Sequence, residues 1–133
     1  MADEATCIET PTRFVRRTIA NATAVPIGTI MKLEDANTVV VSAANSDPFG
    51  GIAWEEKTAS DGLVEITCAM NGLWSFTTTA AAITAGSLVS IGGANTVALA
   101  VESDFPIGSN IGKSRNTIGG GGGTVIVDVG VSI

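Results

Sequence analysis

Apolar and polar residues alternate with a period of two over several short stretches of the chain. In residues 62–70, "GLVEITCAM", one face collects Val64, Ile66, Cys68 and Met70. In residues 123–131, "GTVIVDVGV", one face collects Val125, Val127, Val129 and Val131. In residues 73–78, "LWSFTT", one face collects Trp74 and Phe76. Alternation of this kind, rich in β-branched and aromatic residues, predicts strands that bury one face.

Turn-forming pairs separate these stretches at short intervals. Such pairs occur at Asp61-Gly62, Asn71-Gly72 and Gly92-Gly93. Asp-Gly and Asn-Gly are the pairs that tight hairpins prefer. Many short strands at this spacing are typical of all-β barrels and sandwiches. We therefore predict an all-β fold, and only residues 77–85 could form a short helix.

The chain also contains an internal repeat. Residues 24–41, "AVPIGTIMKLEDANTVVV", match residues 82–99, "AITAGSLVSIGGANTVAL", and 58 residues separate Asn37 from Asn95. The two copies cover about residues 13–70 and 71–133. A unit this short buries its own apolar face poorly. We therefore expect both copies to close one compact β-barrel or β-tulip-like domain over residues 13–133.

Residues 1–12 precede the first alternating stretch and are polar and acidic. They include Pro11, which interrupts any strand that needs a continuous series of N–H groups. We expect a flexible, extended N-terminal arm that becomes ordered when it pairs with a strand of a partner. The segment lacks the apolar core of a signal peptide, so we expect assembly in a cytoplasm.

Composition narrows the classes of partner. Seven basic residues against 13 acidic ones give a net charge of −6, which disfavours nucleic acid because phosphates require excess positive charge. No run approaches the roughly 20 apolar residues of a membrane span, so we expect no membrane partner. An apolar content of 45% with only 15% charged residues leaves much apolar surface. This surface predicts self-association as a homotrimer.

The residues that enzymes use are sparse. The chain has no histidine and no tyrosine, so a Ser-His or Cys-His nucleophile cannot form. Cys7 and Cys68 lack metal-ligand spacing and are expected to be free thiols. Glu55 and Glu56 would point to opposite faces of a strand, which is unsuited to paired acid–base work. We expect no enzymatic activity, no metal and no cofactor.

The stretch Gly112-Lys113-Ser114 resembles part of a phosphate-binding loop. That loop requires four residues between its two glycines, whereas three separate Gly108 from Gly112. It must also open a helix, and the five glycines 119–123 that follow would not sustain one. We interpret the stretch as a strand and hairpin loop of the second copy.

Three of the seven basic residues lie in the stretch "TRFVRR", as Arg13, Arg16 and Arg17 around Phe14. Two interpretations stay open, and the first is favoured. The arginines can simply protect an outer strand from pairing edge to edge. Alternatively, this strand docks on an acidic partner surface, with Phe14 as its anchor.

The remaining aromatic residues divide into two groups. Trp54, Trp74 and Phe76 fall on inward faces, so we expect them in the core rather than on a sugar-binding platform. Phe49 and Phe105 flank the two Pro/Gly corners at matching places in the two copies. We expect these two residues to be exposed at a subunit interface.

These motifs together resemble the capsid decoration (cement) proteins of tailed bacteriophages. The stretches that carry the resemblance are "PIGTIMKLEDANTVVVSAA", "PFGGIAWEEKTASDG", "MNGLWSF", "AAITAGSLVSI" and "GTVIVDVGV". The resemblance implies a β-barrel or β-tulip domain that sits as a trimer on the outer surface of the virion. It further implies binding to the major capsid protein at three-fold or quasi-three-fold positions, which stabilises the shell. The acidic N-terminus and the five-glycine loop depart from the family pattern.

Two other functions remain as alternatives. A carbohydrate-binding or adhesion module on the virion surface would need exposed aromatic residues in a groove, so it depends on the exposure of Trp54 or Trp74. A carboxylate-based hydrolase ranks third, because the acidic residues are scattered along the chain.

Overall fold

The computed structural model describes residues 3–79 and 82–131, and these residues are almost entirely strands and turns. The elements are β1 (Thr6–Glu9), β2 (Phe14–Thr18), β3 (Ile30–Leu33), β4 (Val39–Val41), β5 (Phe49–Ala53), β6 (Glu65–Ala69), β7 (Gly72–Thr78), β8 (Leu88–Gly93), β9 (Thr96–Leu99), α1 (Asp104–Ile107), β10 (Asn110–Ser114) and β11 (Gly123–Val129). The all-β class expected from the sequence is confirmed.

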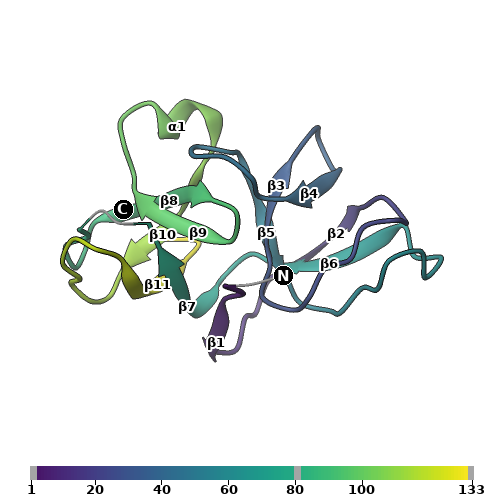
Figure 1. Ribbon diagram of the computed structural model, residues 1–133, viewed down its shortest axis with the longest axis horizontal. Helices are drawn as coiled ribbons and strands as arrows, with labels where there is room; N and C mark the ends of the chain where they lie inside the picture. Colours follow the sequence, from purple (N-terminus) through teal and green to yellow (C-terminus); the bar gives the residue numbers. More distant parts are fainter. Residues whose placement is uncertain (1–2, 80–81, 132–133) are drawn as a thin grey trace.

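The strands form two sheets that correspond to the two halves of the chain. One sheet has the order β2-β6-β5-β3-β4 and the other has the order β1-β7-β11-β10-β8-β9. Strands β2–β6 are called the first unit below, and strands β7–β11 the second unit. Figure 1 shows the two units side by side, with α1 beside the second unit. The strand order is the same in both units, apart from the additional strand β1.

Each unit curls on itself instead of sharing one barrel with the other, which differs from the sequence expectation. In the second unit β7 also pairs in parallel with β9, so its five strands form a closed barrel. In the first unit the equivalent closure is a single parallel bridge between Thr18 and Thr38. Short, strongly twisted strands close after five members because each is rotated relative to its neighbour.

Each unit encloses apolar side chains. The core of the second unit extends to neighbouring residues of the first and includes Trp74, Phe76, Val89, Ile91, Val97, Ile111, Val125, Val127 and Val129. The first unit encloses a smaller cluster made of Ile19, Val25, Met31, Val39, Ala53, Ile66 and Cys68. The predicted burial of Trp74 and Phe76 is confirmed. Val64 was expected to be buried but is 56% exposed, because β6 begins only after it, at Glu65.

A buried turn of the second unit joins the units to one another. Asn95 has a positive φ of 52°, and its Oδ1 accepts a 2.8 Å hydrogen bond from the N–H of Ile30. The N–H of Asn95 donates to Ser42 Oγ at 3.1 Å, and Ser42 Oγ donates to the carbonyl of Gly93 at 3.0 Å. These bonds satisfy main-chain groups of both units away from water, which stabilises one relative orientation of the units.

The N-terminal segment belongs to the fold over much of its length, which corrects the expectation of a flexible arm over residues 1–12. Strand β1 pairs antiparallel with β7, with Cys7 opposite Trp74. Just before it, the N–H of Ala5 donates to the carbonyl of Gly28 at 2.8 Å. A Cβ at Gly28 would collide with the carbonyl oxygen of Ala5. Residues 1 and 2 lie outside the described residues.

Two further segments were ambiguous in the sequence. Lys113 lies inside strand β10, opposite Asp128 of β11, so the Gly-Lys-Ser stretch is part of a sheet, as expected. The short helix considered for residues 77–85 is wrong where the structure describes them. Thr77 and Thr78 end β7, and Ile83 forms a bridge with Ile118; residues 80–81 are not described.

Candidate docking surface around strand β2

Strand β2 carries most of the residues expected to dock on a partner, and it pairs with β6 along one edge. Val15 lies opposite Cys68, and Arg17 lies opposite Ile66. Main-chain groups of alternate residues in a strand point to opposite edges. The carbonyl of Arg13 accepts from the N–H of Met70 at 2.9 Å. The odd-numbered residues therefore bond to β6, whereas the N–H and C=O groups of Phe14 and Arg16 point to the other edge.

Phe14 starts a row of three aromatic side chains that runs from the surface into the molecule. Its side chain is 41% exposed, and its ring centroid lies 5.5 Å from that of Trp54. Trp54 packs edge-on against Trp74 at 5.9 Å, and the indole N–H of Trp74 donates to the carbonyl of Asn71 at 3.0 Å. Trp74 is buried, as predicted. Trp54 is only half-buried, so its predicted place in the core is confirmed in part.

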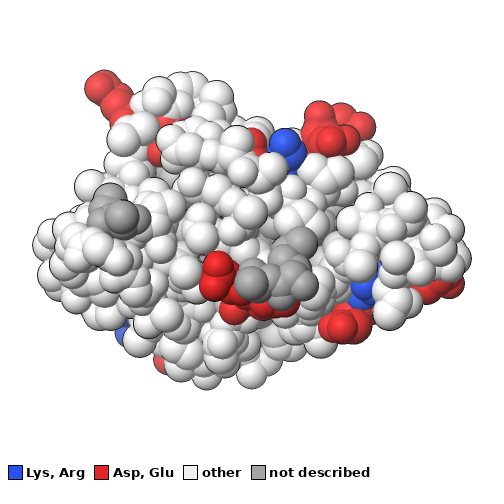
Figure 2. Space-filling view, viewed as in Figure 1, with Lys and Arg blue, Asp and Glu red and all other residues white. Residues whose placement is uncertain are grey.

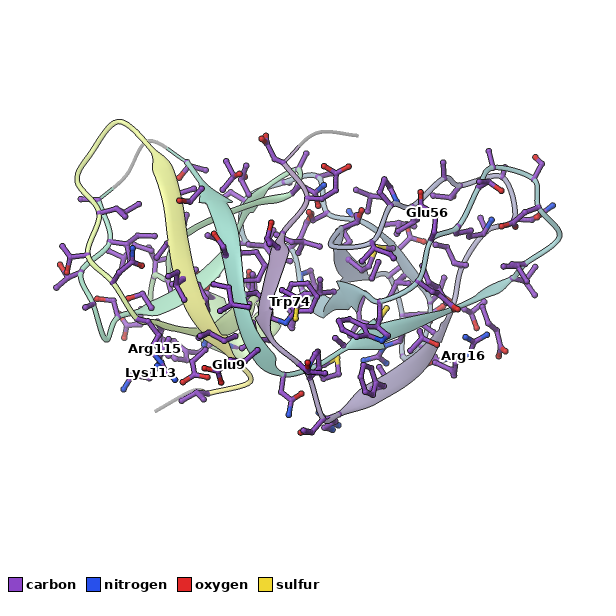
Figure 3. The ribbon with its side chains drawn as sticks, turned by 90° about the horizontal axis from the view of Figure 1, so that it is seen from below. Glu9, Arg16, Glu56, Trp74, Lys113 and Arg115 are labelled. Carbon is purple, nitrogen blue, oxygen red and sulfur yellow. The ribbon has the colours of Figure 1, made fainter. Side chains whose placement is uncertain are left out.

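Arg16 is exposed and belongs to a network of polar side chains on the outer side of the first unit (Figure 3). Its Nη1 lies 2.7 Å from Glu55 Oε1 and 2.7 Å from Thr67 Oγ1, and its Nη2 lies 3.7 Å from Glu65. Glu55 Oε1 also accepts the N–H of Thr67 at 2.8 Å. This role of Glu55 could not be predicted from the sequence, because 39 residues separate it from Arg16.

Arg13 and Arg17 have different surroundings from Arg16. Arg17 is half-buried on the inner side of β2, where its Nε donates to the carbonyl of Gly50 at 3.2 Å. Arg13 precedes the strand and is exposed, and its guanidinium group makes no ion pair with the residues that the structure describes. Phe14 and Arg16 therefore share the outer face of β2, Arg13 is exposed just before the strand, and Arg17 supports the interior.

Phe49 and Phe105, the expected interface pair, differ in exposure. Phe49 is half-buried against the core and donates its N–H to the carbonyl of Gly108 at 2.9 Å. Phe105 lies on α1 and is 53% exposed. Three apolar neighbours in sequence are exposed with it, namely Leu99, Val101 and Ile107. These four exposed residues are called the α1 patch. Figure 2 shows that charged side chains are few and scattered on the face that includes this region.

The two thiols differ in burial: Cys68 is buried and Cys7 is half-buried. Burial raises the pKa of Cys68 to about 11, against smaller contributions from nearby charged groups that include Arg17. Burial also raises the pKa of Cys7. Both thiols are therefore protonated at neutral pH, and neither is bonded to the other in a disulfide.

Residues 3–79 and 82–131 form no pocket and no group of three or more His, Cys, Asp and Glu side chains that could hold a metal ion. No helix within the same residues is long and apolar enough to cross a membrane. The comparisons with models of known protein families and with curated proteins found no match to this chain.

Proposed function

We propose that the chain is a non-enzymatic structural protein of a bacteriophage virion, a capsid decoration protein that binds the outer surface of the head. Its partner is the major capsid protein, at three-fold or quasi-three-fold positions, and the bound protein stabilises the shell. It acts as a homotrimer without a cofactor. The basis of this proposal is the resemblance of the sequence motifs, together with their positions in the fold.

The observation that carries the proposal is the duplicated five-stranded unit. The motif stretches follow its strands: the first covers β3 and β4, the second β5, and the others β7, β8 and β11. The motifs therefore describe a repeated structural frame and not the residues of a chemical site. A rigid frame of this kind suits a protein whose task is to hold neighbouring subunits in place.

Two exposed surfaces support binding to other proteins. The outward side of β2 presents an aromatic anchor, Phe14, on the same face as Arg16, and the exposed Arg13 immediately precedes the strand. Aromatic and arginine side chains contribute most to binding at protein interfaces. The α1 patch presents four apolar side chains that are each more than two-fifths exposed. We assign the first surface to the capsid protein and the second to the trimer.

The proposal is tested with empty expanded and unexpanded heads of the parent virus. Wild-type protein should sediment with expanded heads, should not do so with unexpanded heads, and should raise the temperature at which the heads disrupt. Failure to bind expanded heads would contradict the proposed function. Light scattering of F105S should show less trimer than wild type, with F49S as a comparison in which the half-buried ring mainly affects folding.

The carbohydrate-binding alternative gains no specific support from the tryptophans on which it depended. Trp74 is fully buried, and Trp54 is half-buried between Phe14 and Trp74. We therefore develop only the decoration function.

A further inference from the structure

The two units differ at one edge of their first strand, although the strands have the same register. Val15 lies opposite Cys68 in the first unit, and Trp74 lies opposite Val127 in the second. Trp74 follows Val15 by 59 residues, and Val127 follows Cys68 by the same number. Phe14 and Arg16 of β2 are therefore equivalent to Leu73 and Ser75 of β7.

In the second unit this edge is occupied by a strand. Leu73 pairs with Glu9 of β1, and Ser75 pairs with Thr6. The strand β1 thus bonds to the first half of β7, and β9 bonds to its second half, where Thr77 pairs with Thr96. Together they leave no long unpaired edge on β7.

In the first unit the equivalent edge is open. Strand β2 pairs with β6 only, and the N–H of Thr18 donates to the carbonyl of Asn37 at 2.9 Å. Among residues 3–79 and 82–131, no group bonds to the outward N–H and C=O groups of Phe14 and Arg16. An unpaired edge of this kind accepts an added strand.

We propose that the open edge of β2 at Phe14 and Arg16 binds an extended, acidic segment of the capsid protein, which adds to the sheet as an antiparallel strand. The segment takes the place on β2 that β1 takes on β7. This inference rests on the proposed function, because it names the part of the decoration protein that holds the capsid partner and the form of the segment that is held.

The register of β1 indicates the chemistry of the bound segment. On β7 the residue opposite Leu73 is Glu9, so an equivalent strand on β2 places a residue opposite Phe14 and diagonal to Arg16. Diagonal neighbours across a sheet are within reach of long side chains. Arg13, the residue before Phe14, adds an exposed guanidinium that makes no ion pair with the described residues. Arg16 already bonds to Glu55 at 2.7 Å and lies 3.7 Å from Glu65, so the free positive charge near this edge is that of Arg13. An acidic residue that reaches Arg13 gains a charge-assisted hydrogen bond, whereas a basic one is repelled.

The same charges disfavour a second copy of this chain as the occupant through β2. An antiparallel pair of two β2 strands would bring Arg13 and Arg16 of both copies together. Like charges that face each other across a sheet are destabilising. The basic residues are therefore consistent with both interpretations made from the sequence. They disfavour pairing of β2 with the β2 strand of another copy, and they favour pairing with an acidic strand.

A proline substitution at the open edge tests the proposal directly. R16P removes the outward N–H, which makes no bond inside the molecule, and proline is tolerated on the open side of an edge strand. R16T removes the same charge and keeps the N–H. We expect similar melting temperatures for the two variants, but binding of R16P to expanded heads at least tenfold weaker than that of R16T. Equal binding of the two variants would overturn the proposal.

Light scattering of the same two variants distinguishes the occupant. If R16P dissociates an oligomer that R16T retains, the edge is filled by a second copy of the chain, which overturns the assignment to the capsid protein. If both variants have the same oligomeric state while only R16P loses head binding, the assignment to the capsid protein is supported.

A second measurement uses the wild-type chain and does not depend on heads or on the folding of R16P. The probe is a synthetic peptide of residues 3–11, "DEATCIETP", which fits the equivalent edge of β7. Amide NMR signals of Phe14 and Arg16 should shift on titration, and those of Val15 and Arg17 should shift less because they face β6. Shifts confined to Leu73 and Ser75 would show displacement of β1 alone and would overturn the proposal.

The two measurements also separate this inference from the proposed function. Wild-type protein that fails to bind expanded heads contradicts the decoration function, and the peptide titration then decides whether β2 accepts a strand. If wild-type protein, R16T and R16P all bind expanded heads equally well, the decoration function is supported and the proposed role of the β2 edge is overturned.

Discussion

The two units of this protein share strand order and register but differ in what fills them. Where the second unit has Trp74 and Phe76 in its interior, the first has Val15 and Arg17 at the equivalent positions. The second unit closes by a parallel pairing of β7 with β9, and the first closes by one bridge. The difference shows that one backbone plan accepts both an aromatic interior and a partly polar one.

The comparison also separates two ways of holding a loop. In the first unit the loop before β6 is held by Lys57, whose buried Nζ donates to the carbonyls of Asn21 and Thr58 and to Asp61. The second unit has the five glycines 119–123 in the corresponding loop, and several adopt a positive φ. A buried lysine orders the first loop, whereas the second combines acceptor side chains at Asn116 and Thr117 with glycines whose backbone tolerates a positive φ.

The largest expected effect comes from removing a large aromatic side chain from the core of the second unit. W74A should lower the free energy of unfolding by about 3–5 kcal/mol, because it removes a buried aromatic side chain and leaves a cavity. V15A, at the equivalent position of the first unit, should cost only about 1 kcal/mol, since a half-buried valine loses two carbons. Urea denaturation followed by circular dichroism measures both. Equal losses would mean that the two interiors contribute equally.

The next effect comes from the lysine of the first unit. K57M should lower the free energy of unfolding by roughly 2 kcal/mol, because two carbonyls lose their buried donor and Asp61 loses its ion pair. The control is K113M on β10 of the second unit, which should stay within about 0.5 kcal/mol of wild type. A K57M variant as stable as the control would show that the loop does not depend on this cation.

A smaller effect separates the two Ala-Asn-Thr turns. N95G keeps the positive φ but removes the acceptor of the Ile30 N–H, which should cost about 1–2 kcal/mol. N37G changes the equivalent residue, which is exposed and whose side chain accepts a 3.4 Å bond from Arg17. It should cost less than about 1 kcal/mol. Thermal melting measures both variants. A larger loss for N37G would contradict the role of Asn95 in joining the units.

The smallest expected effect is a dependence of the melting temperature on pH that arises from Asp61 in the first unit. Hydrogen bonds from the N–H of Leu63 and from Lys57 hold the pKa of Asp61 below its usual range. Because the folded pKa is lower than the unfolded one, the stabilisation is complete above about pH 4 and is lost as the pH falls through the folded pKa. Melting temperatures between pH 2 and 7 should therefore fall less steeply for D61N than for wild type. Parallel curves would contradict this.

Much of the fold could be predicted from local patterns. The alternation in residues 73–78 and 123–131 gave strands β7 and β11, and the repeat gave two units with matching elements. Val64 and the short helix were misjudged, since alternation does not show where a strand begins and small apolar residues suit several structures. Helix α1, at Asp104–Ile107, is too short to leave a periodic signal.

The candidate site could be predicted only in part. The cluster of Phe14 with Arg13 and Arg16 was visible in the sequence, and the structure exposes all three, with Phe14 and Arg16 on the outer face of β2. The sequence did not show the partner of Arg16, Glu55, or the inward position of Arg17. Such contacts join residues far apart in the chain, and they depend on the curvature of the sheet.

The sequence by itself determined the all-β class, the duplication and the turns at Asp61-Gly62 and Asn71-Gly72, because period-two patterns and Asn-Gly or Asp-Gly pairs act through local backbone preferences. The turn predicted at Gly92-Gly93 was wrong, since both residues lie in β8 and the turn follows them. Only the tertiary structure decided that each copy closes on itself, that β1 completes one unit and that the edge of β2 stays open. Strand partners are chosen by non-local packing and by competition for the same edges. The same local pattern can satisfy several such pairings, and the side chains that fill each interior select one of them.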